Sequence, residues 1–206
     1  MSILSKKLTA VVLLSLLLLL SGCAVKKNGL SGVESEGYFG LRDAEGRALI
    51  LSAPPRRIVS LSMRGDDVLF ALLGTERIAA FSKFAGNPLI SNIPREAAAM
   101  VPERAQATLE YLMKLKPDLV VIPESQSPDL VRALREMGIP VFVSRTIHQV
   151  EESKKLIRDL AVIVGEVEKG EALVAEMERR LSIIAAKTAQ IPQNERVVVY
   201  RLTVSG

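Results

Sequence analysis

Short apolar runs that alternate with amphipathic segments constrain the fold of this chain more than any other feature. The runs are almost continuously apolar and lie at 57–61, 77–81, 118–122 and 139–143. Segments with helical periodicity or helix start and stop signals lie at 66–73, 109–115, 127–137 and about 147–164. Strands of this kind are buried on both faces. The pattern therefore predicts an α/β fold, in which a parallel sheet is covered by helices on both sides.

Residues that favour helix starts support these boundaries. Ser127 followed by Pro128 is a good beginning for the helix at this point, with Ser at the cap and Pro in the first turn. Thr146 and Gln149 form the pattern of a capping box. We therefore expect another helix to follow Thr146 and to run to about Val164.

Further elements flank this alternation. Residues 38–51 predict a β-hairpin with its turn at 43–46, and 82–107 has no clear periodicity. Residues 166–188 place their apolar side chains on one helical face, which predicts a single helix about 35 Å long. The valine-rich run at 196–200 predicts a strand.

The first residues predict an export signal and a lipid anchor. Lys6 and Lys7 precede an apolar run at 8–20, which is shorter than the ~20 residues of a membrane-spanning helix. The run ends in Leu-Ser-Gly-Cys, which resembles a bacterial lipobox in which Cys23 is lipidated and becomes the mature N-terminus. Residues 24–37 then predict a flexible tether. The alternative is an uncleaved signal anchor with a cysteine there by chance.

Composition excludes several kinds of site and partner. The chain has 27 Lys and Arg against 23 Asp and Glu, and removal of residues 1–22 takes away two lysines, so the net charge falls from +4 to 25 − 23 = +2. This charge is too small to favour nucleic acid as a partner. The single cysteine and the single histidine, His148, exclude an intrachain disulfide, a cysteine-based zinc site and a histidine cluster, and we expect no cofactor.

Segments spread along the chain together resemble one protein family. They are Arg-Asp-Ala-Glu-Gly-Arg at 42–47, Pro-Arg-Arg-Ile-Val-Ser-Leu at 55–61, Asp-Val-Leu-Phe-Ala-Leu-Leu-Gly at 67–74, Leu-Glu at 109–110 with Leu-Lys-Pro-Asp-Leu-Val at 115–120, and Gly-Ile-Pro-Val at 138–141. In this order and spacing they resemble the substrate-binding proteins of bacterial ABC importers for ferric siderophores, haem and cobalamin. The resemblance covers roughly residues 38–206. The loop at 85–104 departs from the family pattern, and Ala107 stands where proline is frequent.

The resemblance implies two α/β lobes with the ligand between them. Residues 38–165 would be the N-terminal lobe and 166–189 the long connector helix. Residues 190–206 would hold the first strand of a second lobe, the remainder of which is missing from these 206 residues. We therefore expect 38–165 to fold as a unit, Ile183 and Ile184 on the connector to be exposed, and ligand affinity without the opposing wall to be weak.

Loops at the carboxyl ends of the parallel strands are the expected ligand site. The candidate residues are Ser62, Met63, Arg64, Ser82, Lys83, Phe84, Glu124, Ser125, Ser144 and Arg145. Arg64, Lys83 and Arg145 follow three different strands, and converging cations would suit an anionic iron chelate. The alternative is that they are solvated loop charges. This rim has no tyrosine, which weakens a haem-ligand interpretation.

Glu110 has two interpretations. The resemblance implies that a glutamate at this point docks onto arginines of the membrane permease. Alternatively, it is an acid favoured by the dipole at a helix N-terminus.

The signal and lipobox predict an extracytoplasmic lipoprotein, held to membrane lipid through Cys23. The family resemblance implies that it binds a ferric siderophore or related chelate and delivers it to an ABC permease. Cobalamin or haem is the alternative ligand. Alternatives of another class are a lipoprotein scaffold, a non-functional fragment or an unrecognised α/β enzyme. An enzyme is not expected because we find no nucleophile or acid–base pair, and His148 falls near a helix start rather than in a triad.

Overall fold

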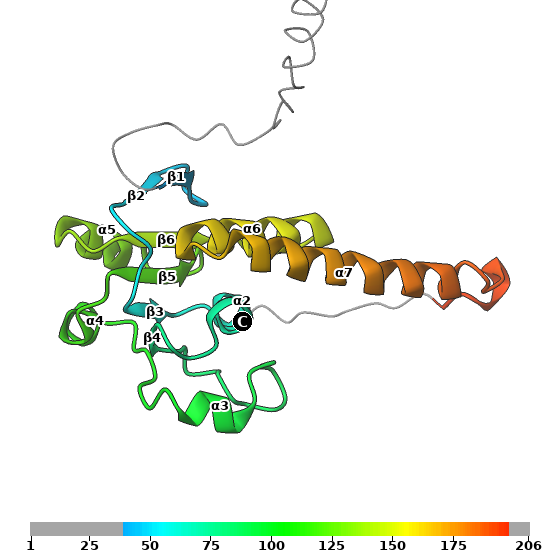
Figure 1. The fold of residues 1–206 in the computed structure, drawn as a ribbon, viewed down its shortest axis with the longest axis horizontal. Coiled ribbons are helices and arrows are strands. Elements are labelled where there is room, and N and C mark those ends of the chain that lie inside the picture. Colours follow the sequence, from blue (N-terminus) through cyan, green and yellow to red (C-terminus); the bar gives the residue numbers. More distant parts are fainter. Residues whose placement is uncertain (1–38, 198–206) are drawn as a thin grey trace, which may run out of the picture. The chain divides into compact units, whose positions relative to one another are not determined.

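The computed structural model describes residues 39–197, and its centre is a parallel sheet (Figure 1). The four strands stand in the order β4-β3-β5-β6. Their bounds are Ile58–Ser60 for β3, Ile78–Ala80 for β4, Leu119–Pro123 for β5 and Val141–Ser144 for β6. All three strand pairs are parallel, so the predicted α/β class is confirmed.

Successive residues of β5 explain why the sheet is covered on both faces. Leu119 and Val121 belong to one buried apolar cluster, and Val120 and Ile122 belong to the other. Neighbouring side chains of a strand point to opposite faces, so each face of the sheet has its own core. The strand is apolar throughout because neither face meets water.

Different helices supply the two cores. Helices α2 (Met63–Leu73) and α6 (Val150–Val164) contribute to the first core, together with Ala98 of the short α3 (Arg95–Ala99). Helices α4 (Leu109–Leu115) and α5 (Pro128–Glu136) contribute to the second. Helix α3 falls in the stretch expected to be irregular.

Two helix starts differ from the predicted ones. Helix α2 begins at Met63, because the Ser62 side chain caps it by accepting a hydrogen bond from the Gly65 amide at 3.1 Å. Helix α6 begins at Val150, and its capping box joins Gln149 to Glu152. The predicted pairing of Thr146 with Gln149 is therefore wrong, although the helix ends at Val164 as expected.

The hairpin is formed by β1 (Phe39–Arg42) and β2 (Ala48–Leu51), as predicted. Its turn is held from inside by Asp43, which accepts hydrogen bonds from the backbone amides of residues 45 and 47. The amide of Ala44 donates to the Val143 carbonyl at 2.9 Å. Arg135 of α5 forms ion pairs with Asp43 and Glu45 at 2.6 and 2.5 Å. These contacts attach the turn to β6 and to α5.

Helix α7 (Val167–Thr188) packs on α6 through its first half, where Gly170 and Val174 are buried. Ile183 and Ile184 are 44% and 56% exposed, as expected for the far half of this helix. A 3₁₀ turn follows at Gln193–Glu195. The strand predicted at 196–200 is not present at 196 and 197, and its remaining residues lie outside the described ones. No helix within 39–197 is long and apolar enough to cross a membrane.

Candidate functional site

The loops that leave the four strands all lie at one edge of the sheet, because the strands are parallel. Ser62, Ser82, Glu124 and Arg145 follow β3, β4, β5 and β6 in turn. The edge therefore collects polar side chains from four segments that are distant in the sequence.

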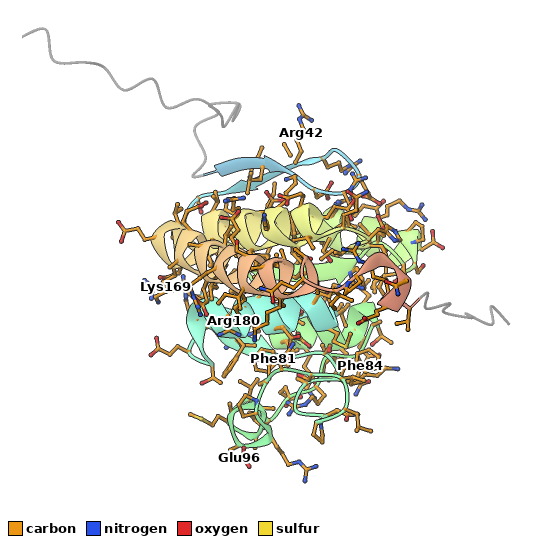
Figure 2. The ribbon with its side chains drawn as sticks, turned by 90° about the vertical axis from the view of Figure 1, so that its right-hand side faces the viewer. Arg42, Phe81, Phe84, Glu96, Lys169 and Arg180 are labelled. Atoms are coloured by element: carbon orange, nitrogen blue, oxygen red, sulfur yellow. The ribbon has the colours of Figure 1, made fainter. Side chains whose placement is uncertain are left out.

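A pocket of about 320 Å³ opens at this edge beside β4. Two segments that line it, 82–84 and 104–107, are joined at Phe81. Phe81 pairs with Arg104 in an isolated parallel bridge, and its carbonyl accepts a hydrogen bond from the Ala105 amide at 2.7 Å. The lining residues are Leu61, Ser82, Lys83, Phe84, Arg104, Ala105, Gln106, Ala107 and Gln126. In Figure 2, Phe81 and Phe84 lie between the sheet and the α3 segment that carries Glu96.

Three of the predicted site residues line this pocket: Ser82, Lys83 and Phe84. The Lys83 ammonium lies 5.2 Å from the centroid of the Phe84 ring, which is a cation–π distance. Phe84 is 37% exposed despite its apolar ring. The pocket thus offers an exposed positive charge next to an accessible aromatic surface, a combination suited to an anionic ligand with apolar parts.

Arg104, from the segment that pairs with Phe81, adds a second cation to the pocket lining. Its guanidinium donates to the backbone carbonyls of Val101 at 2.5 Å and of Glu103 and Ala98 at 3.0 Å. These bonds fix the guanidinium in place, so its charge is pre-positioned, while Lys83 can adjust to a ligand.

Three of the four predicted serines, Ser62, Ser82 and Ser144, are buried. Ser62 caps α2, and Ser82 donates a hydrogen bond to Asp66. The Ser144 hydroxyl lies within hydrogen-bond distance of the Ser62 hydroxyl at 3.4 Å and of the Ile122 carbonyl at 3.3 Å. These hydroxyls hold the strand ends together beneath the surface.

The other predicted residues lie outside the pocket. Arg145 donates to the Ala44 carbonyl at 3.3 Å and lines a separate cavity of about 90 Å³ between the hairpin and α6. Met63 and Arg64 start α2, and Glu124 and Ser125 are exposed after β5. Hydrogen bonds from Thr146 to Glu124 lower the pKa of this carboxyl. The structure therefore does not bring Arg64, Lys83 and Arg145 into one pocket.

Sequence reasoning missed two groups at this edge. Arg104 lies beside the pocket because its backbone pairs with that of Phe81, and no local sequence pattern indicates this contact. Asp66 looks like an ordinary acid of a helix first turn, but it is completely buried. Burial raises the pKa of Asp66 to about 6, although hydrogen bonds from Ser82 oppose this shift.

Residues expected to act away from the ligand are placed as follows. Glu110 is exposed in the first turn of α4. Cys23, the predicted lipidation site, lies outside the described residues. No cluster of three His, Cys, Asp or Glu side chains able to hold a metal ion occurs within residues 39–197.

Comparison with known families decides the membership of the chain. Residues 58–205 match the family described as periplasmic binding protein. The chain belongs to this family. It is a family of binding proteins, which confirms the prediction that the chain is not an enzyme.

Curated relatives agree with this membership. A cobalamin-binding protein of Halobacterium salinarum is 24% identical over 160 residues, which are 78% of this chain and 43% of the relative. An uncharacterized ABC transporter substrate-binding lipoprotein of Bacillus subtilis is 27% identical over 193 residues, covering 88% of this chain and 59% of the relative. The chain spans about half the length of the curated relatives it matches.

Solved structures share the fold. A periplasmic solute binding protein from Veillonella parvula superimposes with a TM-score of 0.61 at 20% identity, over 74% of this chain and 49% of the other. A periplasmic heme-binding protein from Roseiflexus gives a TM-score of 0.56 at 26% identity, over 66% and 51%. Here too the described chain corresponds to about half of the related protein.

Proposed function

We propose that this chain is the N-terminal, ligand-binding lobe and connector helix of an extracytoplasmic ABC importer protein that binds a ferric siderophore or a related iron chelate. In this proposal residues 38–165 form the lobe and 166–189 the connector. The observation that carries it is the pocket at the carboxyl edge of the sheet, which Lys83 and Arg104 line from two different segments. Family membership and relatives named for siderophore and ferric citrate binding support the ligand class.

The chemistry of the pocket suits a bulky anionic chelate. Iron chelates built from carboxylates carry negative charge on their outer oxygens, which Lys83 and Arg104 can meet. Phe84 offers its ring to the apolar parts of the ligand. Gln106 and Gln126 add amide groups that can donate and accept hydrogen bonds. A cobalamin-like ligand is the second candidate, favoured by the cobalamin-binding relative.

Two further parts of the proposal concern location and delivery. Cys23 would carry the lipid that holds the protein at the outer face of the cell membrane, as the names of lipoprotein relatives suggest. Glu110, exposed on α4, would meet the permease through a charge pair that sets the docking register. Glu110→Lys should then block uptake of the chelate and leave its binding unchanged.

Equilibrium dialysis tests the ligand assignment. The probes are radiolabelled ferric citrate, a ferric hydroxamate, haemin and cyanocobalamin, used at high protein concentration because a pocket open to solvent buries only part of a ligand. We expect retention of an iron chelate, weakened roughly tenfold or more in Lys83→Ala, since a charge-assisted hydrogen bond contributes about 1.5–3 kcal/mol.

Lys114→Ala is the matched control, because Lys114 is an exposed lysine of α4 outside the pocket. It should bind as the unmodified chain does. Equal losses in the two lysine variants, or retention of none of the four probes, would contradict the proposal.

A further inference from the structure

Asp66 holds an unusual position beneath the pocket. It lies in the first turn of α2, it is completely buried, and no ion pair joins it to a cation among the described residues. The hydroxyls that face its carboxylate are those of Ser82, from the loop after β4, and Ser60, from β3. The charged group that acts on it is Asp67, its neighbour on α2, whose charge is of the same sign.

A chain of hydrogen bonds joins this carboxylate to the pocket wall. The Ser82 amide donates to both carboxylate oxygens at 3.2 Å, and the Ser82 hydroxyl donates to one of them at 2.5 Å. The same hydroxyl accepts the Phe84 amide at 3.3 Å. The carboxylate therefore fixes the backbone at both ends of the Ser82–Phe84 segment.

We propose that Asp66 is a positioning residue for the ligand pocket: its carboxylate holds the Ser82–Phe84 segment in the form that presents Lys83 and Phe84 to the ligand. The positioning role of Asp66 rests on the proposed function of the pocket. The hydrogen-bond chain itself can be tested without a ligand. Among the residues that line the pocket, Ser82 is the one that donates hydrogen bonds to Asp66, so the effect of Asp66 on binding passes through this segment.

The carboxylate must be ionised to act in this way. An ionised carboxylate accepts both bonds from Ser82, whereas a protonated one carries a hydrogen on one oxygen and becomes a donor there. Because burial raises the pKa of Asp66 to about 6, the charged form is lost under mildly acidic conditions. The segment should then loosen, and the pocket should lose affinity for an anionic ligand as the pH falls through about 6.

Amide chemical shifts of the full chain between pH 4.5 and 8 are the first test. The Ser82 and Phe84 amides should titrate together, with a midpoint near 6. Asp66→Asn, which keeps the size of the side chain, should abolish both titrations. Asp129→Asn is the matched control, because Asp129 is a first-turn aspartate of another helix and is exposed, and it should leave both titrations unchanged.

Ser82→Ala separates the hydrogen-bond chain from a general effect on folding. This variant keeps the hydrogen bond from the backbone N–H of residue 82 to Asp66 and removes the hydroxyl that links Asp66 to Phe84. The backbone amide of residue 82 should still titrate, and the Phe84 amide should not. If the Phe84 amide titrates in Ser82→Ala, or if either amide titrates with the same midpoint in Asp66→Asn, the proposal is overturned.

Binding of gallium(III) citrate, a diamagnetic stand-in for ferric citrate, is the second test. The affinity of the unmodified chain should fall several-fold between pH 7.5 and 5 relative to that of Asp66→Asn, a comparison that cancels the titration of citrate itself. Equal pH dependence in the two proteins would overturn the proposal while leaving the proposed function intact. Absence of binding at every pH would instead contradict citrate as the ligand class, and the amide titrations would still decide the role of Asp66.

Discussion

Gly170 of α7 crosses α6 directly over Ala161, so closely that a methyl group at position 170 would overlap the methyl group of Ala161. This contact sets the distance between the two helices and therefore the path of α7 away from the sheet. One turn further along, Leu173 packs against the core that includes Ala161, and Val174 is buried. The proposed connector role of α7 needs such a fixed crossing, because a small change in angle there would be a large displacement at its far end.

Gly170→Ala should therefore destabilise the chain. Overpacking of this kind costs about 1–3 kcal/mol, which outweighs the gain of up to about 1 kcal/mol from better helix propensity. The double variant Gly170→Ala, Ala161→Gly moves the methyl group to the other helix and should recover most of the loss. Urea unfolding of the three proteins measures this. Equal stability of the unmodified chain and the single variant would show that the helices do not pack as described.

Arg135 should matter more to stability than its neighbour Arg132. Arg135→Ala leaves the buried Asp43 carboxylate without its cation, which costs roughly 1–3 kcal/mol. Arg132 pairs with Asp129 and Glu136 on the surface of the same helix, so Arg132→Ala should cost less than about 1 kcal/mol. Hydrogen exchange of the hairpin amides should rise in the first variant only. The reverse order would contradict the attachment of the hairpin through Arg135.

Asp66 should make the stability of the chain depend on pH. Its pKa rises from 3.8 to about 6 on burial, so its contribution to the free energy of unfolding is fully present below pH 3.8 and is lost as the pH rises through about 6. The loss is at most about 3 kcal/mol. Asp66→Asn should remove this decline. Denaturant unfolding at a series of pH values checks it, and parallel curves for the two proteins would refute the raised pKa.

Cys23→Ser should release the protein from membranes or block its maturation, because a hydroxyl cannot take the place of the lipidated sulfur. Fractionation of producing cells, with a labelled fatty acid to follow acylation, measures this. Unchanged membrane association and unchanged processing in the variant would contradict the lipoprotein assignment.

The regular elements could be predicted because their signals are local. Helix α4 was expected at 109–115 and lies there, since Pro117 ends its periodic pattern. The parallel sheet follows from four apolar runs of similar length. These features depend on residues close together in the sequence, where propensity, capping and periodicity agree.

The details of the edge could not be predicted because they depend on distant contacts. The Thr146 amide, expected to begin a capping box, is bound instead by Glu124 from the loop after β5. Asp66 is buried because Ser82, sixteen residues later, returns to cover it. Arg145 donates a hydrogen bond to Ala44 of the hairpin and does not line the pocket that Lys83 lines. Each of these is a tertiary hydrogen bond without a sequence signature.

In the proposed function, an anionic metal chelate binds at the carboxyl edge of the sheet, between the segments around Lys83 and Arg104. Amide shift mapping with gallium(III) citrate on the isotopically labelled chain tests it most directly, since it locates even weak binding. We predict that the perturbed amides gather at 82–84 and 104–107. Perturbations confined to the hairpin cavity beside Arg145, or the absence of any perturbation at high ligand concentration, would contradict the account.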